Sequence, residues 1–430
     1  MSTNRPPGSL AEACYATRTA DVHAYLERLE ARFAEREPAV QAFVPEEGRF
    51  ARLHREADAL LRAYPRLDRR PPFFGVPVGI KDIFHVDGFP TTGGSRLPPE
   101  VLQGPEAEVV TALRKKGILI LGKTVSTEFA YFAPGPTRNP HNPEHTPGGS
   151  SSGSAAAVGA GLCALTFGTQ TIGSVVRPAA FCGVVGFKPS YGRIPTQGII
   201  PLAPSLDHVG WFTTDVTSAA TAAEELYKDW FPSFSVRWPV LGIPEGPYLS
   251  HASEEGLAHF RDTCDWLSGR YRVRSVPVMP DFDKIMARHD RLLAAEVAQV
   301  HTGWFPEHRN LYAPQTAELI ERGQKVTPGQ TARDRAGRKR LRNQLCDLMD
   351  ELRIDLFLSP AAVGPPPRGL GSTGSPVMSI PWTHAGLPVL SIPAGQSKDG
   401  LPMGLQITGR WWADADLLDW GKEIARVVAL

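Results

Sequence analysis

Three segments of the chain carry side chains suited to acyl transfer. The first runs from Pro147 to Gly161 and reads PGGSSSGSAAAVGAG, which places glycines and serines directly before an apolar run of small residues. Such a run is expected to form a buried helix, so a tight loop entering a helix is favoured over a flexible linker. Backbone N–H groups without intrahelical acceptors gather at such a helix start, together with hydroxyl groups. This segment is therefore the first candidate for a functional site.

The second segment, TQTIGSVVRPAAFCGVVGFKPS, covers Thr169 to Ser190 and follows ALTFG, a predicted strand. A serine in a Thr/Gly-rich turn beyond a strand, here Ser174, can present its hydroxyl beside several backbone N–H groups. That arrangement suits attack on a carbonyl, because the carbonyl oxygen becomes an anion as the tetrahedral intermediate forms. Gly–Ser turns are common, so the pattern by itself does not establish catalysis.

The third candidate is Lys81, which ends the run GVPVGI. The alternation of Val76, Val78 and Ile80 predicts a short strand, and Pro77 within it favours an edge strand or a bulge. In isolation, a lysine at a strand end is more typical of a surface residue. If it is buried, desolvation lowers the pKa of the ammonium, and a neutral lysine can act as a general base near neutral pH.

Together these segments resemble the amidase signature family, whose catalytic centre is a Ser–Ser–Lys triad. The family motif of two glycines followed by serines falls on Gly148, Gly149, Ser150 and Ser151. Its bridging serine, which follows a cis peptide bond, falls on Ser150, its nucleophile on Ser174 and its lysine on Lys81. The flanks GKTVSTEFA, FCGVVGFKPS, SLDHVG and AGLPVLSIPAG also match, so the resemblance runs from about Phe74 to Arg410.

The resemblance implies that Ser174 attacks an amide carbon while its proton passes to Ser150 and on to neutral Lys81. The resulting oxyanion would be held by the backbone N–H groups of Thr171, Ile172, Gly173 and Ser174. Losing one such donor typically costs about 2.7–4 kcal/mol of transition-state stabilisation. The relay then returns a proton to the leaving nitrogen, which departs as ammonia or an amine, and water hydrolyses the acyl-enzyme.

Three positions around the nucleophile differ from the usual family pattern. Ile172 stands where most relatives have glycine, Gln170 replaces an aspartate, and the usual arginine is displaced by one position to Arg177. Isoleucine is compatible with an oxyanion hole unless the position requires positive φ. The displaced arginine resembles malonamidase-like members, in which it grips a substrate carboxylate with a bidentate fork. A malonamate-like amide is therefore expected, with a structural salt bridge of Arg177 as the alternative.

Other expectations concern the rest of the site. Thr169, Gly149 and Ser151 are expected to contact the substrate together with Arg177. Cys182 is not expected to be the nucleophile, because FCGVVGF is typical of a buried core. Neither a metal nor another cofactor is implied, since the 12 histidines show no HExxH spacing and the Gly-rich run lacks the GK[ST] end of a phosphate loop.

Alternative functions share this chemistry in part. The A subunit of a glutamine-dependent tRNA amidotransferase has the same triad but needs partner subunits, and the displaced arginine and the short chain count against it. An allophanate-type hydrolase would also suit Arg177. An inactive family member acting as a binding protein is the third alternative, against which the complete triad counts.

Composition limits the partners. The 430 residues carry a net charge of +1, with 42% hydrophobic and 21% charged residues, which is ordinary for a soluble protein without nucleic-acid or membrane partners. The basic run from Arg333 to Arg342 is expected to be a solvated helix face. Five cysteines without a CxxC pair and the absence of an apolar leader indicate a cytoplasmic protein. The expected partners are a small amide and, at most, a second copy in a homodimer.

The elements that position these residues alternate between helix and strand. A helix is predicted over Pro105–Lys116, followed by the strand ILILG, and this order is typical of an α/β sheet. We expect a single amidase signature domain over residues 1–430, with a large mixed β-sheet covered by helices on both faces. Residues 1–63 are expected to form N-terminal helices, and residues 227–351 a largely helical insertion. A closing helix is predicted over Trp411–Leu430.

Overall fold

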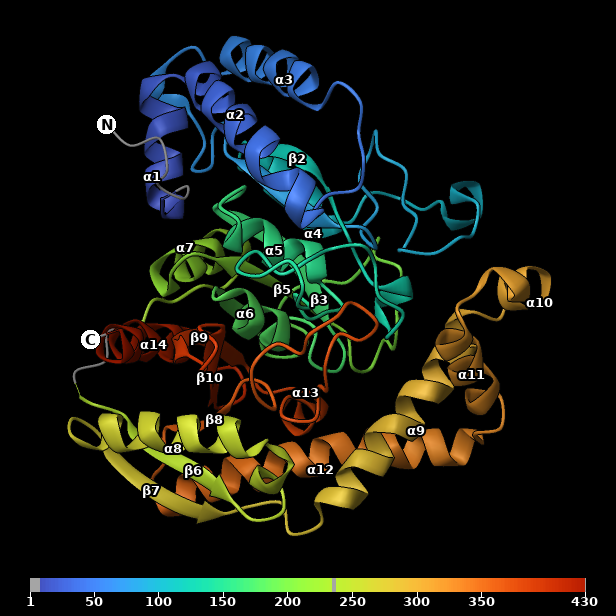
Figure 1. The fold of residues 1–430 in the computed structure, drawn as a ribbon, viewed down its shortest axis with the longest axis vertical. Helices are drawn as coiled ribbons and strands as arrows, with labels where there is room; N and C mark the ends of the chain where they lie inside the picture. The colour runs from blue at the N-terminus through green and yellow to red at the C-terminus, as the bar shows by residue number, and fades with distance from the viewer. Residues whose placement is uncertain (1–7, 234–236, 430) are drawn as a thin grey trace.

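The computed structural model describes residues 8–233 and 237–429. Its centre is a ten-stranded mixed sheet, which runs down the molecule in Figure 1 in the order β2-β1-β3-β5-β4-β9-β10-β8-β6-β7. The strands are β1 (Pro77–Lys81), β2 (Leu119–Thr124), β3 (Leu165–Gln170), β4 (Val185–Lys188), β5 (His208–Thr213), β6 (Val240–Glu245), β7 (Arg272–Pro277), β8 (Leu356–Pro360), β9 (Val389–Gln396) and β10 (Pro402–Gly409). Most of these strands are buried over their whole length, because helices cover them.

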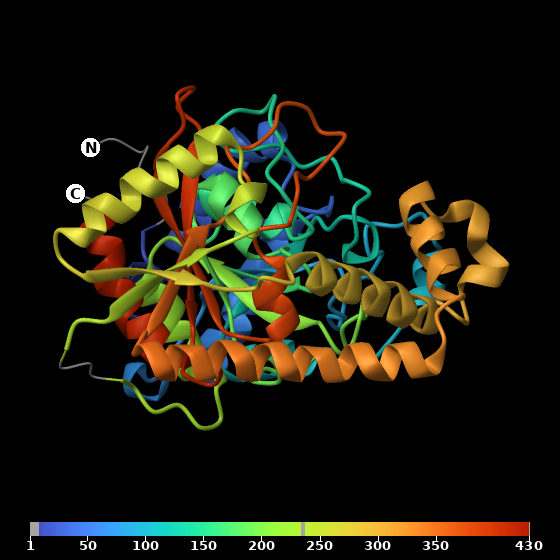
Figure 2. The same ribbon diagram turned by 90° about the horizontal axis from the view of Figure 1, so that it is seen from below.

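Helices lie on both faces of the sheet, as Figure 2 shows for the end near β7. They are α1 (Leu10–Tyr15), α2 (Val22–Val40), α3 (Arg49–Ala63), α4 (Glu108–Lys115), α5 (Ser152–Gly159), α6 (Val176–Cys182), α7 (Val216–Leu226), α8 (Glu254–Ser268), α9 (Phe282–Val300), α10 (Phe305–His308), α11 (Pro314–Gly323), α12 (Pro328–Leu352), α13 (Ile380–Ala385) and α14 (Asp414–Val428). The predicted fold class, an α/β fold with a large mixed sheet covered on both faces, is confirmed.

Small residues allow the central helices to approach the sheet closely. A side chain at Gly404 of β10 would meet Ala180 of α6 at 2.7 Å, and one at Gly421 of α14 would meet Leu390 of β9 at 2.4 Å. Because Gly404 and Leu390 point to opposite faces of the paired strands β9 and β10, α6 and α14 cover opposite faces. Helix α6, which follows the Ser174 loop, is therefore held directly on the sheet.

Strand β1 is an interior strand that pairs with β2 on one side and β3 on the other. The edge position suggested by Pro77 is therefore wrong, whereas the suggested bulge is present as a register shift between Val78 and Gly79. Proline is tolerated here because it is the first residue of the strand, where a missing N–H costs little. The strand thus delivers Lys81 to the interior of the sheet, one strand away from its edge.

Two predicted helices have later starts than expected. The helix predicted from Pro105 begins at Glu108, and the closing helix begins at Asp414, two residues after Trp412 with its positive φ of 65°. A left-handed residue cannot belong to a right-handed helix, so the chain turns before the helix begins. Leu430, the last residue of the predicted closing helix, lies outside the described residues.

The segment 227–351 contributes two strands at one end of the sheet as well as helices. β6 and β7 extend the sheet, while α9 to α12 form an arm that projects to the right in Figure 1 and again in Figure 2. The arm contacts the rest of the chain through Phe129, whose ring lies 4.6 Å from that of His301 and 5.4 Å from that of Tyr312. Among the helices of residues 8–233 and 237–429, none is long and apolar enough to cross a bilayer.

Candidate active site

Lys81 is completely buried at the carboxyl end of β1. Its Nζ lies 2.7 Å from Ser150 Oγ and 2.9 Å from Thr169 Oγ1, and it forms no ion pair with any described residue. Burial holds the pKa of the Lys81 ammonium well below its usual value, and the negative charge of Asp207 only partly opposes that shift. Lys81 is therefore not a surface lysine, and its neutral amine can accept a proton from the Ser150 hydroxyl.

The glycine–serine motif lies across the first turn of α6. The peptide bond between Gly149 and Ser150 is cis, and Gly148 has a positive φ of 81°. A side chain at Gly148 would meet the backbone of Pro178 at 2.9 Å, so only glycine permits this approach. Arg177 Nη2 donates to Gly149 O at 2.7 Å. These contacts bring Ser150 beside the segment that carries Ser174.

Ser174 lies in the loop between β3 and α6, and 5% of its surface is exposed. In the part of the chain that the structure describes, the N–H groups of Ile172, Gly173 and Ser174 have no hydrogen-bond acceptor. Three consecutive free N–H groups can stabilise an anion at this point. Ile172 is not among the residues with positive φ, so isoleucine fits this loop without backbone strain.

The three predicted catalytic residues are not joined into one hydrogen-bonded chain. The contact of Lys81 with Ser150 is formed, whereas no hydrogen bond joins Ser150 to Ser174 among the described residues. Catalytic hydrogen bonds of unliganded sites are often long and tighten when substrate binds. The arrangement can pass a proton from Ser174 to Lys81 once the two hydroxyls come together.

Gln170 organises the loop that carries Ser174. Its Oε1 accepts the N–H groups of Val175 and Val176 at 2.8 and 3.0 Å, and its Nε2 donates to Thr383 Oγ1 at 2.9 Å. Thr383 in turn donates to Ile172 O at 2.8 Å. An amide is suited to this position because it accepts at the start of α6 and donates to a neighbouring hydroxyl at the same time.

Replacing Gln170 by leucine is expected to lower the free energy of unfolding by about 2–4 kcal/mol, because it leaves two buried N–H groups and a hydroxyl without this partner. Urea unfolding measures the change. Thr383→Val is the control, since it removes only the far end of the network and should cost about 1 kcal/mol. Equal losses in the two variants would contradict the role of Gln170.

Arg177 is also almost completely buried, with 2% of its surface exposed. Nη2 contacts Gly149 O and, at 3.1 Å, Thr373 Oγ1, whereas Nε and Nη1 have no partner among residues 8–233 and 237–429. No described carboxylate pairs with it, so the salt-bridge alternative finds no partner there. Burial lowers the pKa of the guanidinium to about 9, so the group remains charged at neutral pH.

Three further residues named from the sequence form hydrogen bonds near Lys81 and the loop that carries Ser174. Thr169 Oγ1 contacts Lys81, Ser151 Oγ donates to Thr169 O at 3.1 Å, and Thr171 Oγ1 donates to Asp207 Oδ1 at 2.5 Å. Cys182 is buried in α6, where burial raises the pKa of its thiol, so a reactive thiolate is disfavoured. No group of three metal-ligating side chains occurs within the described ranges.

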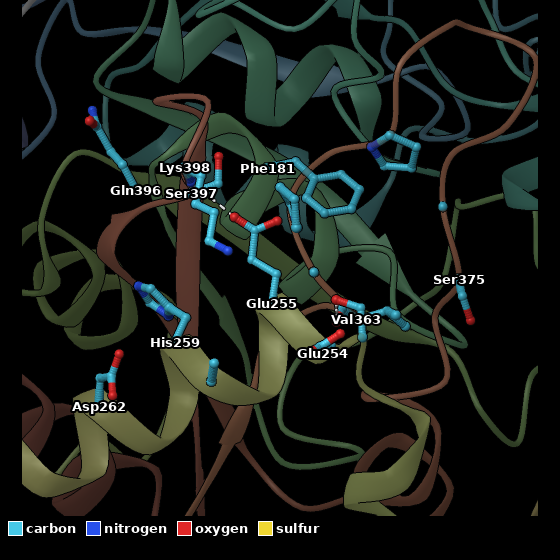
Figure 3. Close-up of a pocket in the computed structure, with 16 residues that line it drawn as sticks. Phe181, Glu254, Glu255, His259, Asp262, Val363, Ser375, Gln396, Ser397 and Lys398 are labelled. Atoms are coloured by element: carbon cyan, nitrogen blue, oxygen red, sulfur yellow. Dashed lines mark hydrogen bonds between the residues drawn. The ribbon is translucent and has the colours of Figure 1, made fainter.

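A surface hollow of about 820 Å³ lies beside this site (Figure 3). Figure 3 shows Glu254, Glu255 and His259 along α8 on one side of it and Lys398 on the other. Lys81, Ser150 and Ser174 do not line it. Its lining includes Phe181 of α6, one helical turn after Arg177, and Gly374, which follows Thr373, so it borders the candidate site.

Several residues that hold the site were not predicted from the sequence. Thr373 and Thr383 lie about 200 positions after the residues that they contact, and nothing in their local sequence marks them. Asp207 lies in SLDHVG, one of the flanks that match the family, so a signal for it was present. Its contact with Thr171 connects two segments that lie 36 positions apart.

Comparison with known proteins decides the family. The amidase family matches residues 22–251 and 276–418, which is most of the chain. The chain belongs to the amidase family. This amidase is 32% identical to a solved structure described as "Crystal structure of amidase", with a TM-score of 0.87 over 96% of this chain and 98% of the other. It is therefore an enzyme that acts on C–N bonds.

Curated relatives point to a narrower group. This amidase is 30% identical over 416 residues to the A subunit of the glutamyl-tRNA(Gln) amidotransferase of Koribacter versatilis, covering 85% of this chain and 86% of the relative. It is 32% identical over 414 residues to the corresponding protein of Trichlorobacter lovleyi, covering 81% and 82%. The malonamidase-like subfamily suggested by the displaced arginine finds no support among these relatives.

Proposed function

We propose that this amidase uses Ser174 as nucleophile, Ser150 as the bridging hydroxyl and Lys81 as the base. The observation that carries the proposal is a fully buried lysine, 2.7 Å from Ser150, without an acidic partner among residues 8–233 and 237–429. As Ser174 Oγ bonds to the amide carbon, its proton moves to Ser150, whose own proton moves to Lys81. The proton then returns along the same path to the leaving nitrogen, and the C–N bond breaks. A water molecule, deprotonated by the same route, cleaves the acyl-enzyme.

The substrate we propose is a small primary amide that carries a carboxylate. The support is Arg177, a buried cation with two nitrogen atoms free among the described residues. Glutamine has both a side-chain amide and a carboxylate, and the curated relatives belong to amidotransferases. We therefore place glutamine first, as a nitrogen donor, and a malonamate-like monoamide second. The transferase alternative would require partner subunits and glutamyl-tRNA as acceptor, which the sequence did not lead us to expect.

Ammonia release tests both candidates with the chain alone. The panel is glutamine, a malonamate-type monoamide and a neutral primary amide of similar length. Release from either carboxylated amide in preference to the neutral one supports the proposal and selects the substrate. Glutaminase activity that appears only with partner subunits supports the transferase alternative. If the folded protein releases no ammonia either alone or with partner subunits, an inactive binding protein is favoured.

Arg177→Met is expected to raise KM for the carboxylated amide by about 10- to 100-fold relative to the neutral amide, because it removes charge-assisted hydrogen bonds. The neutral amide is an internal control for the loss of the contact between Arg177 and Gly149, which affects both substrates. Thr373→Val, which removes the other partner of the guanidinium, should change the ratio much less. An equal change in KM for both amides would exclude a carboxylate-binding role.

A further inference from the structure

Asp207 is a carboxylate of the site that the proposed mechanism does not use. Its Oδ1 accepts the Thr171 hydroxyl at 2.5 Å, and its Oδ2 accepts the N–H groups of Leu202 and Ala203 at 3.0 and 3.1 Å. It forms no ion pair with any residue that the structure describes. The carboxylate is therefore held in place by neutral donors, with one of them in the proposed oxyanion loop.

A small cavity connects this carboxylate with the surroundings of Lys81. The largely enclosed space of about 50 Å³ is lined by Thr169, Thr171 and Asp207, among others. Thr169 Oγ1 is the group that contacts Lys81 Nζ at 2.9 Å. A cavity of this size with polar groups on its wall can hold ordered water. The path from Lys81 to Asp207 therefore consists of the hydrogen bond between Lys81 and Thr169 and the cavity that Thr169 and Asp207 line.

Part of the wall of this cavity also faces the surface. Asp207, Pro204 and Thr196 line both this cavity and a surface hollow of about 420 Å³ that Tyr191 and Trp412 border. Asp207 is accordingly half-buried, whereas His208, the next residue, is buried. Its carboxylate lies between solvent and the rear of the candidate site, so it can respond to pH without exposing Lys81.

The charged groups that act on Asp207 and Lys81 come from three elements. Lys81 of β1 experiences Asp207 as its opposing charge, and Glu296 of α9 repels Asp207. Glu296 is itself paired with Arg335 of α12 at 2.7 Å. Burial raises the pKa of the Asp207 carboxyl, while the Thr171 hydroxyl and the two N–H groups oppose the rise. Removal of this negative charge would leave the Lys81 ammonium with less stabilisation.

We propose that Asp207 is a positioning residue, whose carboxylate fixes Thr171 and, across the inner cavity, favours the protonated form of Lys81 against the effect of burial. The inference rests on the proposed function of the triad. Asp207 is not a catalytic residue, because it touches neither Ser174 nor Ser150 in the described contacts. Without it, desolvation alone would act on the lysine, and the pH range of the base would move.

The test uses a small fluorophosphonate, which labels an activated serine without any amide substrate. The labelling rate of Ser174 is measured against pH by intact mass. In the wild type it should rise with pH as Lys81 loses its proton. Asp207→Asn keeps an oxygen acceptor for Thr171 but removes the charge. The acid limb, which is the part of the profile where the labelling rate rises with pH, should therefore move to lower pH by about one unit. Thr171→Val keeps the charge, so the rate should fall while the limb stays in place.

The outcomes separate this inference from the proposed function. If the wild type is not labelled, the nucleophile assignment fails. If the wild type is labelled but the limb of Asp207→Asn coincides with that of the wild type, the electrostatic role of Asp207 is wrong. Should Asp207→Asn not fold, Thr171→Val still decides, because a limb displaced by loss of the hydroxyl alone would overturn the proposal. Thermal unfolding of each variant verifies that it is folded.

Discussion

Replacement of Ser174 by alanine is expected to lower kcat/KM for amide hydrolysis by a factor on the order of 10⁴ to 10⁶. The variant keeps the free N–H groups of Ile172 and Gly173 but has no oxygen that could form the acyl-enzyme. A residual rate above that in water would come from these donors and from binding. The measurement is ammonia release from the best amide of the panel, together with fluorophosphonate labelling, which should vanish.

Cys182→Ala provides the matched control for the nucleophile. Cys182 is the buried residue of the same segment that could otherwise be suspected of attack on the substrate, and its thiol donates to Pro147 O at 3.4 Å. Its removal is expected to leave kcat/KM within a few-fold of the wild type. Activity that survives in Ser174→Ala but is lost in Cys182→Ala would reverse the assignment.

Lys81→Met is expected to lower kcat/KM by a factor on the order of 10³, since a positioned general base contributes about 10² to 10⁴. Methionine fills a similar volume but has no basic nitrogen. In the wild type, activity should rise with pH through the depressed pKa of Lys81, because only the neutral amine accepts a proton. The variant should lose this acid limb as well as the rate, and kcat/KM measured across pH detects both changes.

The same substitution has a second signature in stability. Above the depressed pKa of Lys81 in the folded state, the folded protein has lost a proton that the unfolded chain keeps until about pH 10.4. In that interval the free energy of unfolding of the wild type therefore gains about 1.4 kcal/mol per pH unit relative to Lys81→Met. Urea unfolding at several pH values measures the difference. A difference that does not change with pH would show that Lys81 is charged in the folded protein.

Lys188 is a matched control for these effects. It is equally buried, burial lowers its pKa to about 7, and its Nζ donates to the carbonyl groups of Pro189 and Leu387 rather than to a serine. Lys188→Met should change the pH dependence of stability in the same direction but leave the acid limb of activity in place. Loss of the limb in both variants would indicate a general effect of buried lysines.

Much of the fold follows from local patterns. The apolar run ILILG and the alternation before Lys81 correspond to β2 and β1, because period and chain punctuation decide whether a segment becomes a strand or a helix. The position of β1 inside the sheet was not predictable from Pro77. Strand order depends on pairing partners far along the chain, and proline at the first position of a strand is compatible with an interior place.

The candidate site likewise has features that the sequence predicts and features that depend on the tertiary fold. The residue types of the proposed triad and the spacing of Ser150 and Ser174 can be identified in the sequence. The replacement of the usual aspartate by Gln170 can be identified there as well. The reason that Gln170 is acceptable is not, because its partner Thr383 lies 213 positions later. Likewise, nothing local indicates that Arg177 would keep free nitrogen atoms, since that depends on which side chains the tertiary fold brings near it.

The sequence by itself determined which groups are available for acyl transfer and which local loops carry them, because these depend on residue type and short-range spacing. Only the tertiary structure decided the charge of those groups. Desolvation at the end of β1 disfavours the charged form of Lys81, and the distant segment around Asp207 supplies the opposing charge. Burial and hydrogen bonding are sums over neighbours contributed by the whole chain, so no single segment contains them.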